Sequence, residues 1–239
     1  YSADSFQGHF DGNGQTITGL SISSASGADT AVGLFGVVDG GTVENLTLSG
    51  VKINVPSNEC AGGAIGLLTG GGTADQITVY GTVSAARGNG GIVGRMTISG
   101  TISNCTNHAE ISGTGANVGG IVGAAYYTGD YASGVSPMYI TNCTNNGTIT
   151  GTAGGVGGIV GLSSAHVSGC TNTADITGNG ADVGGIVAEQ QNYGSVIDCT
   201  NSGTITNENK TAYGTGGIVG WVRYNGETDA YPTKAIIEI

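Results

Sequence analysis

One short block recurs along most of this chain at a nearly fixed interval. The block is a glycine pair, two apolar residues and usually a further glycine, and its first apolar residue lies at positions 34, 64, 92, 121, 159, 186 and 218. A period of about 30 residues is the signature of a repeat architecture, in which each unit packs against its neighbours. The repeat therefore predicts an elongated, stacked fold.

A second motif runs in phase with the first. Residues 102–107 read Ile-Ser-Asn-Cys-Thr-Asn, and close variants follow at 140–145, 167–172 and 196–201. An earlier variant places leucine at the cysteine position, which indicates a buried apolar column. The predicted column consists of Leu46, Cys105, Cys143, Cys170 and Cys199.

The composition favours short strands joined by turns. Glycine supplies 48 of 239 residues, and the β-branched segments are punctuated by Gly and Asn, as is typical of strands and turns. No stretch longer than a turn or two has the 3.6-residue period of an amphipathic helix. The sequence therefore predicts an all-β chain folded as a right-handed parallel β-helix, or β-solenoid, of about seven coils of roughly 28 residues.

The domain prediction follows the repeat. Residues 1–225 are predicted to form the solenoid, with residues 1–30 as its initial coil and residues 124–139 as an insertion loop. Within the initial coil, residues 11–14 (Asp-Gly-Asn-Gly) predict a tight reversal between strands. Residues 226–239 break the period and are predicted to be a C-terminal tail or linker strand. Three roles are open for this tail: leading to a further domain, pairing locally, or adding to the sheet edge of another subunit.

The asparagines that end the second motif are predicted to stack. If Cys105 points inward, strand alternation directs Thr106 outward and Asn107 inward or into the turn. Stacked amides can bond to one another and to the turn backbone, and Asn tolerates the left-handed turn conformation. The predicted column consists of Asn107, Asn145, Asn172 and Asn201.

Cysteine chemistry is predicted to be structural. Neighbouring cysteines of the column would lie about 4.8 Å apart, which a disulfide permits, but parallel side chains need not meet with the required torsion. Buried free thiols are the favoured interpretation, and a disulfide stays open as the alternative. The chain has no C-x-x-C pair, and residues 11–14 lack most ligands of a calcium loop. The sequence therefore predicts neither a metal nor a cofactor.

The two apolar residues of the repeat motif pose a geometric question. Adjacent residues of a regular strand face opposite sides, so both cannot point inward. We expect either one column facing outward, where it would need a cover, or a bend at the motif.

Enzyme activity is not expected. Parallel β-helices include polysaccharide lyases and hydrolases, which require carboxylates clustered with one another or with Arg and Lys. In this sequence the basic residues are scattered, and most acidic residues are single. The net charge of −11 disfavours a nucleic-acid partner, and no apolar run is long enough to span a membrane.

Aromatic residues are the candidate ligand contacts. Tyrosines concentrate in residues 124–139, and further aromatic residues follow the repeat motif in later coils. Exposed Tyr and Trp suit sugar or protein recognition because each has an apolar face and a polar tip, although such rings can equally cap a core. The predicted contacts are Tyr126, Tyr127, Tyr131, Tyr139, Tyr193, Trp221 and Tyr224.

The motifs also carry a family resemblance. Gly33-Leu34-Phe35-Gly36 resembles the four-residue pattern that gives the GLUG-motif proteins their name, and the later Gly-Ile-Val-Gly copies look like variants of it. The lead-in at residues 10–17 is similar to that of many such proteins. The resemblance covers roughly residues 6–222. It implies a secreted or surface-attached bacterial protein, often adhesin-like, and it transfers no catalytic residue.

The expected function is a non-enzymatic adhesion or scaffold module of a bacterial surface protein, secreted or at the cell surface, with a host or matrix glycan or protein as partner. One alternative is a filament subunit that associates end to end, because open β-helix ends are unpaired sheet edges. Another is a carbohydrate-binding or carbohydrate-active β-helix. Ice binding through the threonines at 148, 150, 204 and 206 is disfavoured, because acidic residues at 110 and 175 interrupt the array.

Overall fold

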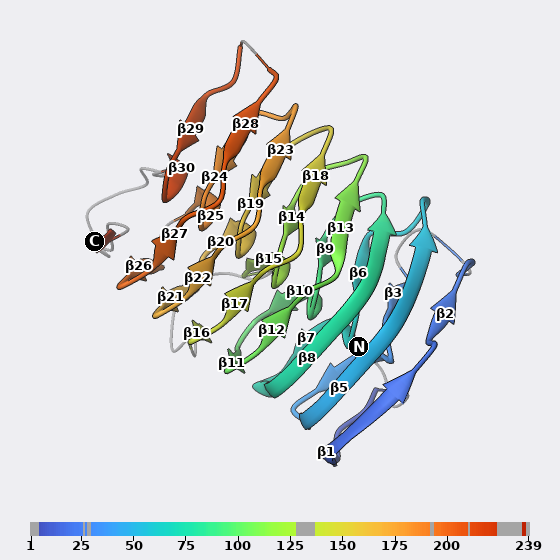
Figure 1. Cartoon of the computed structure of the whole chain (residues 1–239). Helices are drawn as coiled ribbons and strands as arrows, with labels where there is room; N and C mark the ends of the chain where they lie inside the picture. Colours follow the sequence, from blue (N-terminus) through green and yellow to red (C-terminus); the bar gives the residue numbers. More distant parts are fainter. Residues whose placement is uncertain are drawn as a thin grey trace.

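The computed structural model describes residues 5–25, 27, 30–127, 137–191, 194–209, 211–223 and 236–237. All regular elements of these residues are β-strands, and every strand pairing among them is parallel. The strands stack coil upon coil from the N-terminal to the C-terminal end of one solenoid (Figure 1). The predicted all-β parallel solenoid of about seven coils is therefore confirmed.

Each coil passes through three sheets, which we call C, A and B in chain order. Sheet C consists of β3 (Ala31–Val32), β6 (Cys60–Gly62), β9 (Asn89–Gly90), β14 (Val118–Gly119), β19 (Gly155–Gly157), β24 (Asp182–Gly184) and β29 (Gly214–Gly216). Sheet A consists of β4 (Phe35–Asp39), β7 (Ile65–Thr69), β10 (Val93–Thr97), β15 (Val122–Tyr126), β20 (Val160–Ser163), β25 (Val187–Gln190) and β30 (Val219–Val222).

Sheet B is the largest and changes character along the solenoid. Its N-terminal strands are β1 (His9–Thr18), β2 (Ser21–Ile22), β5 (Thr42–Val55) and β8 (Gly72–Ala85). Later coils contribute three short strands each: β11 (Gly100–Ser103), β12 (Thr106–Asn107) and β13 (Glu110–Gly113); β16 (Met138–Thr141), β17 (Thr144–Asn145) and β18 (Ile149–Gly151); β21 (His166–Ser168), β22 (Thr171–Asn172) and β23 (Ile176–Gly178); β26 (Ser195–Ile197), β27 (Thr200–Asn201) and β28 (Ile205–Asn207). The last strand is β31 (Ile236–Ile237).

The repeat motif forms the bend between sheets C and A. β9 ends at Gly90 and β10 begins at Val93, so Ile92 lies between strands and strand alternation does not apply to it. Ile92 and Val93 are both fully buried, as are the equivalent pairs at 121–122, 159–160 and 186–187. Of the two arrangements expected from the sequence, the bend is the one observed, and these four copies present no outer apolar column.

Backbone crowding at this bend explains the glycines. A Cβ on Gly91 would overlap the side-chain amide of Asn107 and the carbonyl oxygen of Gly120 in the next coil. The carbonyl oxygen of Ile121 accepts N–H bonds from both Ile92 (3.1 Å) and Val93 (3.0 Å), which holds successive bends in contact. The glycines therefore permit close packing between coils.

The asparagine column is a continuous chain of buried amides. Nδ2 of Asn107 donates to Oδ1 of Asn145 at 2.8 Å, Asn145 donates to Asn172 at 2.7 Å, and Asn172 donates to Asn201 at 2.7 Å. Asn107 also donates to the carbonyl of Ala109 and accepts its N–H, both at 3.0 Å. Each amide thus bonds along the column and to its own turn.

This column decides where sheet B is continuous. The equivalent positions in the earlier coils hold Leu48 and Val79, and there β5 and β8 run unbroken through the column. In the coils with asparagine, the side-chain amide bonds the backbone two residues on, and the strand breaks after it, as between β12 and β13. The asparagine therefore accounts for the strand break that follows it in each of these coils.

The left-handed backbone position differs from the one expected. The residue before the cysteine column takes positive φ, as at Asn104, Asn142 and Asp198 (each 53°), so the left-handed residue is not the stacked asparagine. Asn13 also has a positive φ, of 50°, and here the register between β1 and β5 shifts, so residues 11–14 form a bulge inside β1. The tight reversal predicted at residues 11–14 is wrong, because these residues lie inside β1 and the chain keeps its direction along β5 on both sides of the bulge.

The structure describes parts of the predicted insertion loop and of the predicted tail. Residues 124–126 end β15, and residues 138–139 begin β16, so both ends of the predicted insertion 124–139 belong to repeated strands. In the tail, β31 pairs with β26, joining Ile236 to Ser195 and Ile237 to Val196. Local pairing is therefore observed for these two residues of the predicted tail 226–239.

Candidate binding surfaces

The outward side chains of sheet B form a long regular surface, which we call the B face. One of its columns holds a threonine in every coil, in the position that follows the cysteine column. Alternation points these side chains outward, and each is partly or well exposed. The column consists of Thr16, Thr47, Thr78, Thr106, Thr144, Thr171 and Thr200.

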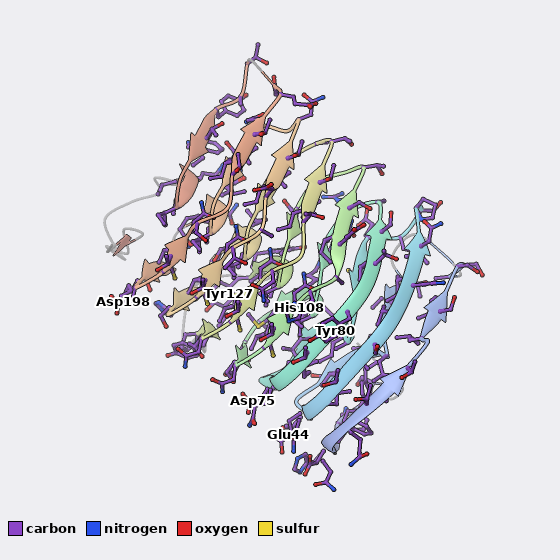
Figure 2. All side chains as sticks on the ribbon, viewed as in Figure 1. Glu44, Asp75, Tyr80, His108, Tyr127 and Asp198 are labelled. Atoms are coloured by element: carbon purple, nitrogen blue, oxygen red, sulfur yellow. The ribbon has the colours of Figure 1, made fainter. Side chains whose placement is uncertain are left out.

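Two tyrosine–histidine stacks stand on the B face. Tyr80 stacks on His108 of the next coil, with ring centroids 4.4 Å apart and planes 1° from parallel, and Figure 2 shows the two side by side. Tyr139 stacks on His166 in the same way at 5.5 Å and 28°. Both tyrosines are 42% exposed. In each stack the histidine covers the tyrosine from the C-terminal side.

Carboxylates line one edge of the B face, where Figure 2 shows Glu44, Asp75 and Asp198 projecting. Asp75 accepts hydrogen bonds from Ser103 Oγ (2.6 Å) and Asn104 Nδ2 (2.8 Å). Partial burial acts to raise the pKa of Asp75, but the hydrogen bonds outweigh it, so this pKa lies below its usual value. The carboxylate stays ionised and this edge is negative.

The predicted ligand-contact residues that the structure describes do not converge on one site. Tyr139 lies on the B face, whereas Tyr126 and Trp221 lie in β15 and β30 of sheet A. Tyr127 is half-buried and packs against the core. The remaining three, Tyr131, Tyr193 and Tyr224, lie outside the described residues.

Sequence reasoning missed Tyr80 because no local motif marks it. The available signal was the register between neighbouring coils. Val79 and Asn107 occupy equivalent positions, so the residues that follow them, Tyr80 and His108, are also neighbours.

A cluster of charged and aromatic side chains was also missed. It joins sheets C and A in the last coils. Arg223 Nε lies 3.2 Å from Glu189 Oε1, and Gln191 Nε2 donates to the same oxygen at 3.0 Å. The Arg223 guanidinium lies over the Trp221 ring at 4.7 Å from its centroid, and Trp221 stacks on Tyr213 at 5.4 Å. The bend at the repeat motif places residues that precede the motif, such as Tyr213, beside residues that follow it, such as Trp221. The sequence signal for this cluster was the spacing of these residues on the two sides of the motif.

Asp182 is the buried carboxyl group of this cluster. Burial raises the pKa of Asp182 to about 6, the negative charge of Glu189 adds to the rise, and Arg223 opposes it. A carboxyl group with a raised pKa beside a second carboxyl group is a pattern of acid–base catalysis. Here Asp182 is only 2% exposed, and Glu189 is held by Arg223 and Gln191. A general acid must reach its substrate, so this arrangement is that of a structural network.

A similar cluster occupies the earlier coils. Glu59 pairs with Arg87 at 3.3 Å and with Arg95 at 3.7 Å, and the Arg95 guanidinium lies 5.6 Å from the Tyr126 ring centroid. With Arg223, these are all the arginines of the sequence. The basic charge of the described chain is thus concentrated away from the B face.

The four cysteines of the column are free and buried, so the disulfide alternative is not observed, and Cys60 is buried as well. Hydrogen bonding between neighbouring thiols, together with burial, raises the pKa of Cys143, Cys170 and Cys199 well above the ordinary value. Within the described ranges, no three His, Cys, Asp or Glu side chains are grouped as metal ligands.

Known proteins resemble this chain in sequence and in fold. A protein-family model described as the GLUG motif matches residues 179–206. Halomucin of Haloquadratum walsbyi is 43% identical over 84 residues, and a protein of Evansella cellulosilytica described as a Gly-rich membrane protein is 42% identical over 81 residues. These matches cover 34% and 33% of this chain but 1% and 9% of the relatives, so the chain spans less than a tenth of either.

A crystal structure shares the fold. A protein of Bacteroides ovatus assigned as an immunoglobulin A1 protease superposes with a TM-score of 0.58 at 21% identity, over 96% of this chain and 68% of that one. In the part of this chain that is described, no helix is long and apolar enough to cross a membrane. The chain therefore carries a match to the GLUG motif at residues 179–206, within a parallel β-solenoid whose other coils repeat a similar glycine-rich bend.

Proposed function

We propose that this chain is a non-enzymatic module of an extracellular surface protein and that it acts by adhesion or as a scaffold. The observation that carries the proposal is the B face, a regular polar surface with an uninterrupted threonine column and two exposed tyrosines. The GLUG motif and the local similarity to Halomucin and to a Gly-rich membrane protein support a location at the cell surface. The burial of Asp182 supports the absence of catalysis, because this carboxyl group, whose pKa is raised, is closed to a substrate.

Binding and turnover can be measured together on the purified protein. Matrix glycans and glycoproteins are immobilised, and both retention of the protein and release of sugar or peptide products are recorded. We expect saturable binding without product. Product release that is abolished by Asp182→Asn or Glu189→Gln would overturn the non-enzymatic proposal.

A matched pair of variants locates the binding surface. Thr144→Glu combined with Thr171→Glu adds two negative charges to the centre of the B face, whereas Arg87→Glu changes the net charge by the same amount near sheet C. We expect the first variant to lose binding and the second to keep it. Equal loss in both would show that net charge, and not the B face, governs retention.

A second candidate function is a filament subunit that associates end to end. Within the described residues, β28, β29 and β30 pair with a neighbour on one side only, and Ile205, Ile218 and Val219 are half-buried where their equivalents one coil earlier are fully buried. Exposed edges and apolar residues favour self-association. Sedimentation velocity over a hundredfold concentration range tests this candidate, and a monomer throughout would exclude it.

A further inference from the structure

We infer that the B face binds an extended polysaccharide without acidic groups, with sugar rings stacked on Tyr80 and Tyr139. The inference rests on the proposed adhesion function and deepens it by naming the ligand class and the contacts. It does not use the aromatic residues selected from the sequence, apart from Tyr139.

Tyr80 has one ring face free. His108 covers its C-terminal side. On the N-terminal side the register of β5 skips between Leu48 and Val51, which places Ser49 and Gly50 opposite Tyr80. A Cβ on Gly50 would meet only the backbone nitrogen of Gly19, at 3.9 Å, and a Cβ on Gly19 would meet nothing within 4 Å. Small residues therefore leave an open shelf beside the free face of Tyr80.

Tyr139 repeats this arrangement. His166 covers its C-terminal side and is itself fixed by Ser195, whose Oγ lies 2.9 Å from the His166 Nδ1. On the N-terminal side, Tyr139 is in register with Thr101 and then Thr73. Both stacks therefore have the same direction along the solenoid. In each, a histidine lies on the C-terminal side of the tyrosine and small or hydroxyl-bearing residues lie on its N-terminal side.

The geometry of the two shelves suits a sugar ring. A third ring in the stack would occupy the height of one coil, about 4.8 Å, and tyrosine offers an apolar face for the C–H groups of a sugar beside a polar tip. The threonine column runs between the two shelves and supplies hydroxyl donors and acceptors. From the two-coil offset and the seven-residue strand length between Thr73 and Tyr80, the tyrosines lie about 25 Å apart. A polysaccharide can therefore engage both, and linkage of the two contacts strengthens binding.

Charge selects the kind of polysaccharide. Among the described residues, the B face carries one lysine, Lys52, and no arginine, since the arginines lie beside sheets A and C. Its acidic side chains outnumber this lysine; they are Asp11, Glu44, Asp75, Glu110, Asp175 and Asp198. A negative surface repels uronate or sulfate groups and attracts amines. Neutral and amine-bearing chains fit this face, and acidic chains do not.

The test measures Kd for soluble oligosaccharides by calorimetry. The ligands are β-1,4-linked oligomers of glucose, N-acetylglucosamine, glucosamine and galacturonate, each as a dimer and a hexamer. The variants are Tyr80→Ala, Tyr139→Ala and their double, with Tyr80→Phe retaining the ring. The matched control is Tyr213→Ala, which removes a 76% exposed tyrosine that stacks on Trp221 away from the B face. Circular dichroism verifies that each variant is folded.

We expect at least one neutral or amino hexamer to bind more tightly than its dimer. Each Tyr→Ala change should weaken hexamer binding about tenfold, as for an aromatic anchor, while Tyr80→Phe and Tyr213→Ala should bind like the parent. Emission from the single tryptophan should stay unchanged on binding, because Trp221 lies in sheet A. Quenching of Trp221 with loss of binding in Tyr213→Ala would place the ligand elsewhere and overturn the inference.

Failure of this inference is separable from failure of the proposed function. A parent protein that adheres to matrix protein but binds none of the oligomers would overturn the glycan inference and leave adhesion standing. Preference for galacturonate would refute the charge argument. A protein that retains no partner at all would remove both.

Discussion

Removal of one amide from the asparagine column should destabilise the solenoid severely. Asn145 is fully buried and makes four side-chain hydrogen bonds: it donates to Asn172 Oδ1 (2.7 Å) and the Gly147 carbonyl (2.9 Å), and it accepts from Asn107 Nδ2 (2.8 Å) and the Gly147 N–H (3.3 Å). A net value of about 1 kcal/mol for each bond gives a loss of about 4 kcal/mol for Asn145→Ala. For a chain of this length, that loss lowers Tm by about 12 °C.

Two further variants distinguish the loss of hydrogen bonds from the loss of packing as the cause of the destabilisation. Asn145→Leu fills the same space, and the earlier coils hold Leu48 in this column, but leucine leaves the same four partners unbonded. We expect it to be nearly as destabilising as alanine, because β17 lies in a broken strand whose turn depends on the amide. Thr144→Ala, on the neighbouring outward position, should change stability by less than about 0.5 kcal/mol.

The assay is urea denaturation followed by circular dichroism, with amide exchange at Gly147 as a local probe, because solenoids can unfold in segments. The reasoning would be refuted by full stability of Asn145→Leu, which would assign the column to packing alone. It would also be refuted by an Asn145→Ala variant no less stable than Thr144→Ala.

Three further outcomes follow from the structure. The buried thiols with raised pKa, such as Cys143, should resist iodoacetamide at pH 8 and react fully in denaturant; rapid native labelling would contradict this. Burial raises the pKa of Asp182 to about 6 from 3.8, so its contribution to stability is full below about pH 4 and is lost as pH rises through 6, on the order of 3 kcal/mol. Asp182→Asn should flatten this part of the stability–pH curve and stabilise the protein at pH 7, and an unchanged curve would argue against the assignment. Gly91→Ala should cost about 3 kcal/mol or more, because its Cβ would overlap Asn107, whereas Gly217→Ala at the same motif position, with nothing within 4 Å, should be nearly neutral in the same denaturation assay.

Periodicity was sufficient to predict the class of fold. The repeat motif and the cysteine motif share one period, and a parallel solenoid satisfies both, because equivalent residues then stack in register. Leu46 at a cysteine position identified that column as buried, and it is buried. The prediction failed at residues 11–14, where the same residue types are compatible with a turn and with a bulge. These residues have the composition of a turn, but pairing with the parallel strand β5 holds them in a bulge.

The candidate surfaces were less predictable. The clustering of tyrosines in the sequence predicted a ligand contact at residues 124–139, but Tyr126 and Tyr139 belong to different sheets. Tyr80 and His108 are 28 residues apart and stack only because the coils are in register. The same holds for Asp182, Glu189 and Arg223, which the bend between sheets C and A brings together.

The sequence by itself determined the repeat, the parallel stacking and the columns that face the core, because these depend on spacing along the chain and on the alternation of strands. Only the tertiary structure decided that Ile92 and Val93 both point inward, because a bend replaces strand alternation at the motif. It also decided which side chains meet across coils, since contacts between residues one period apart depend on register, and the register shifts locally at a bulge such as residues 11–14 of β1.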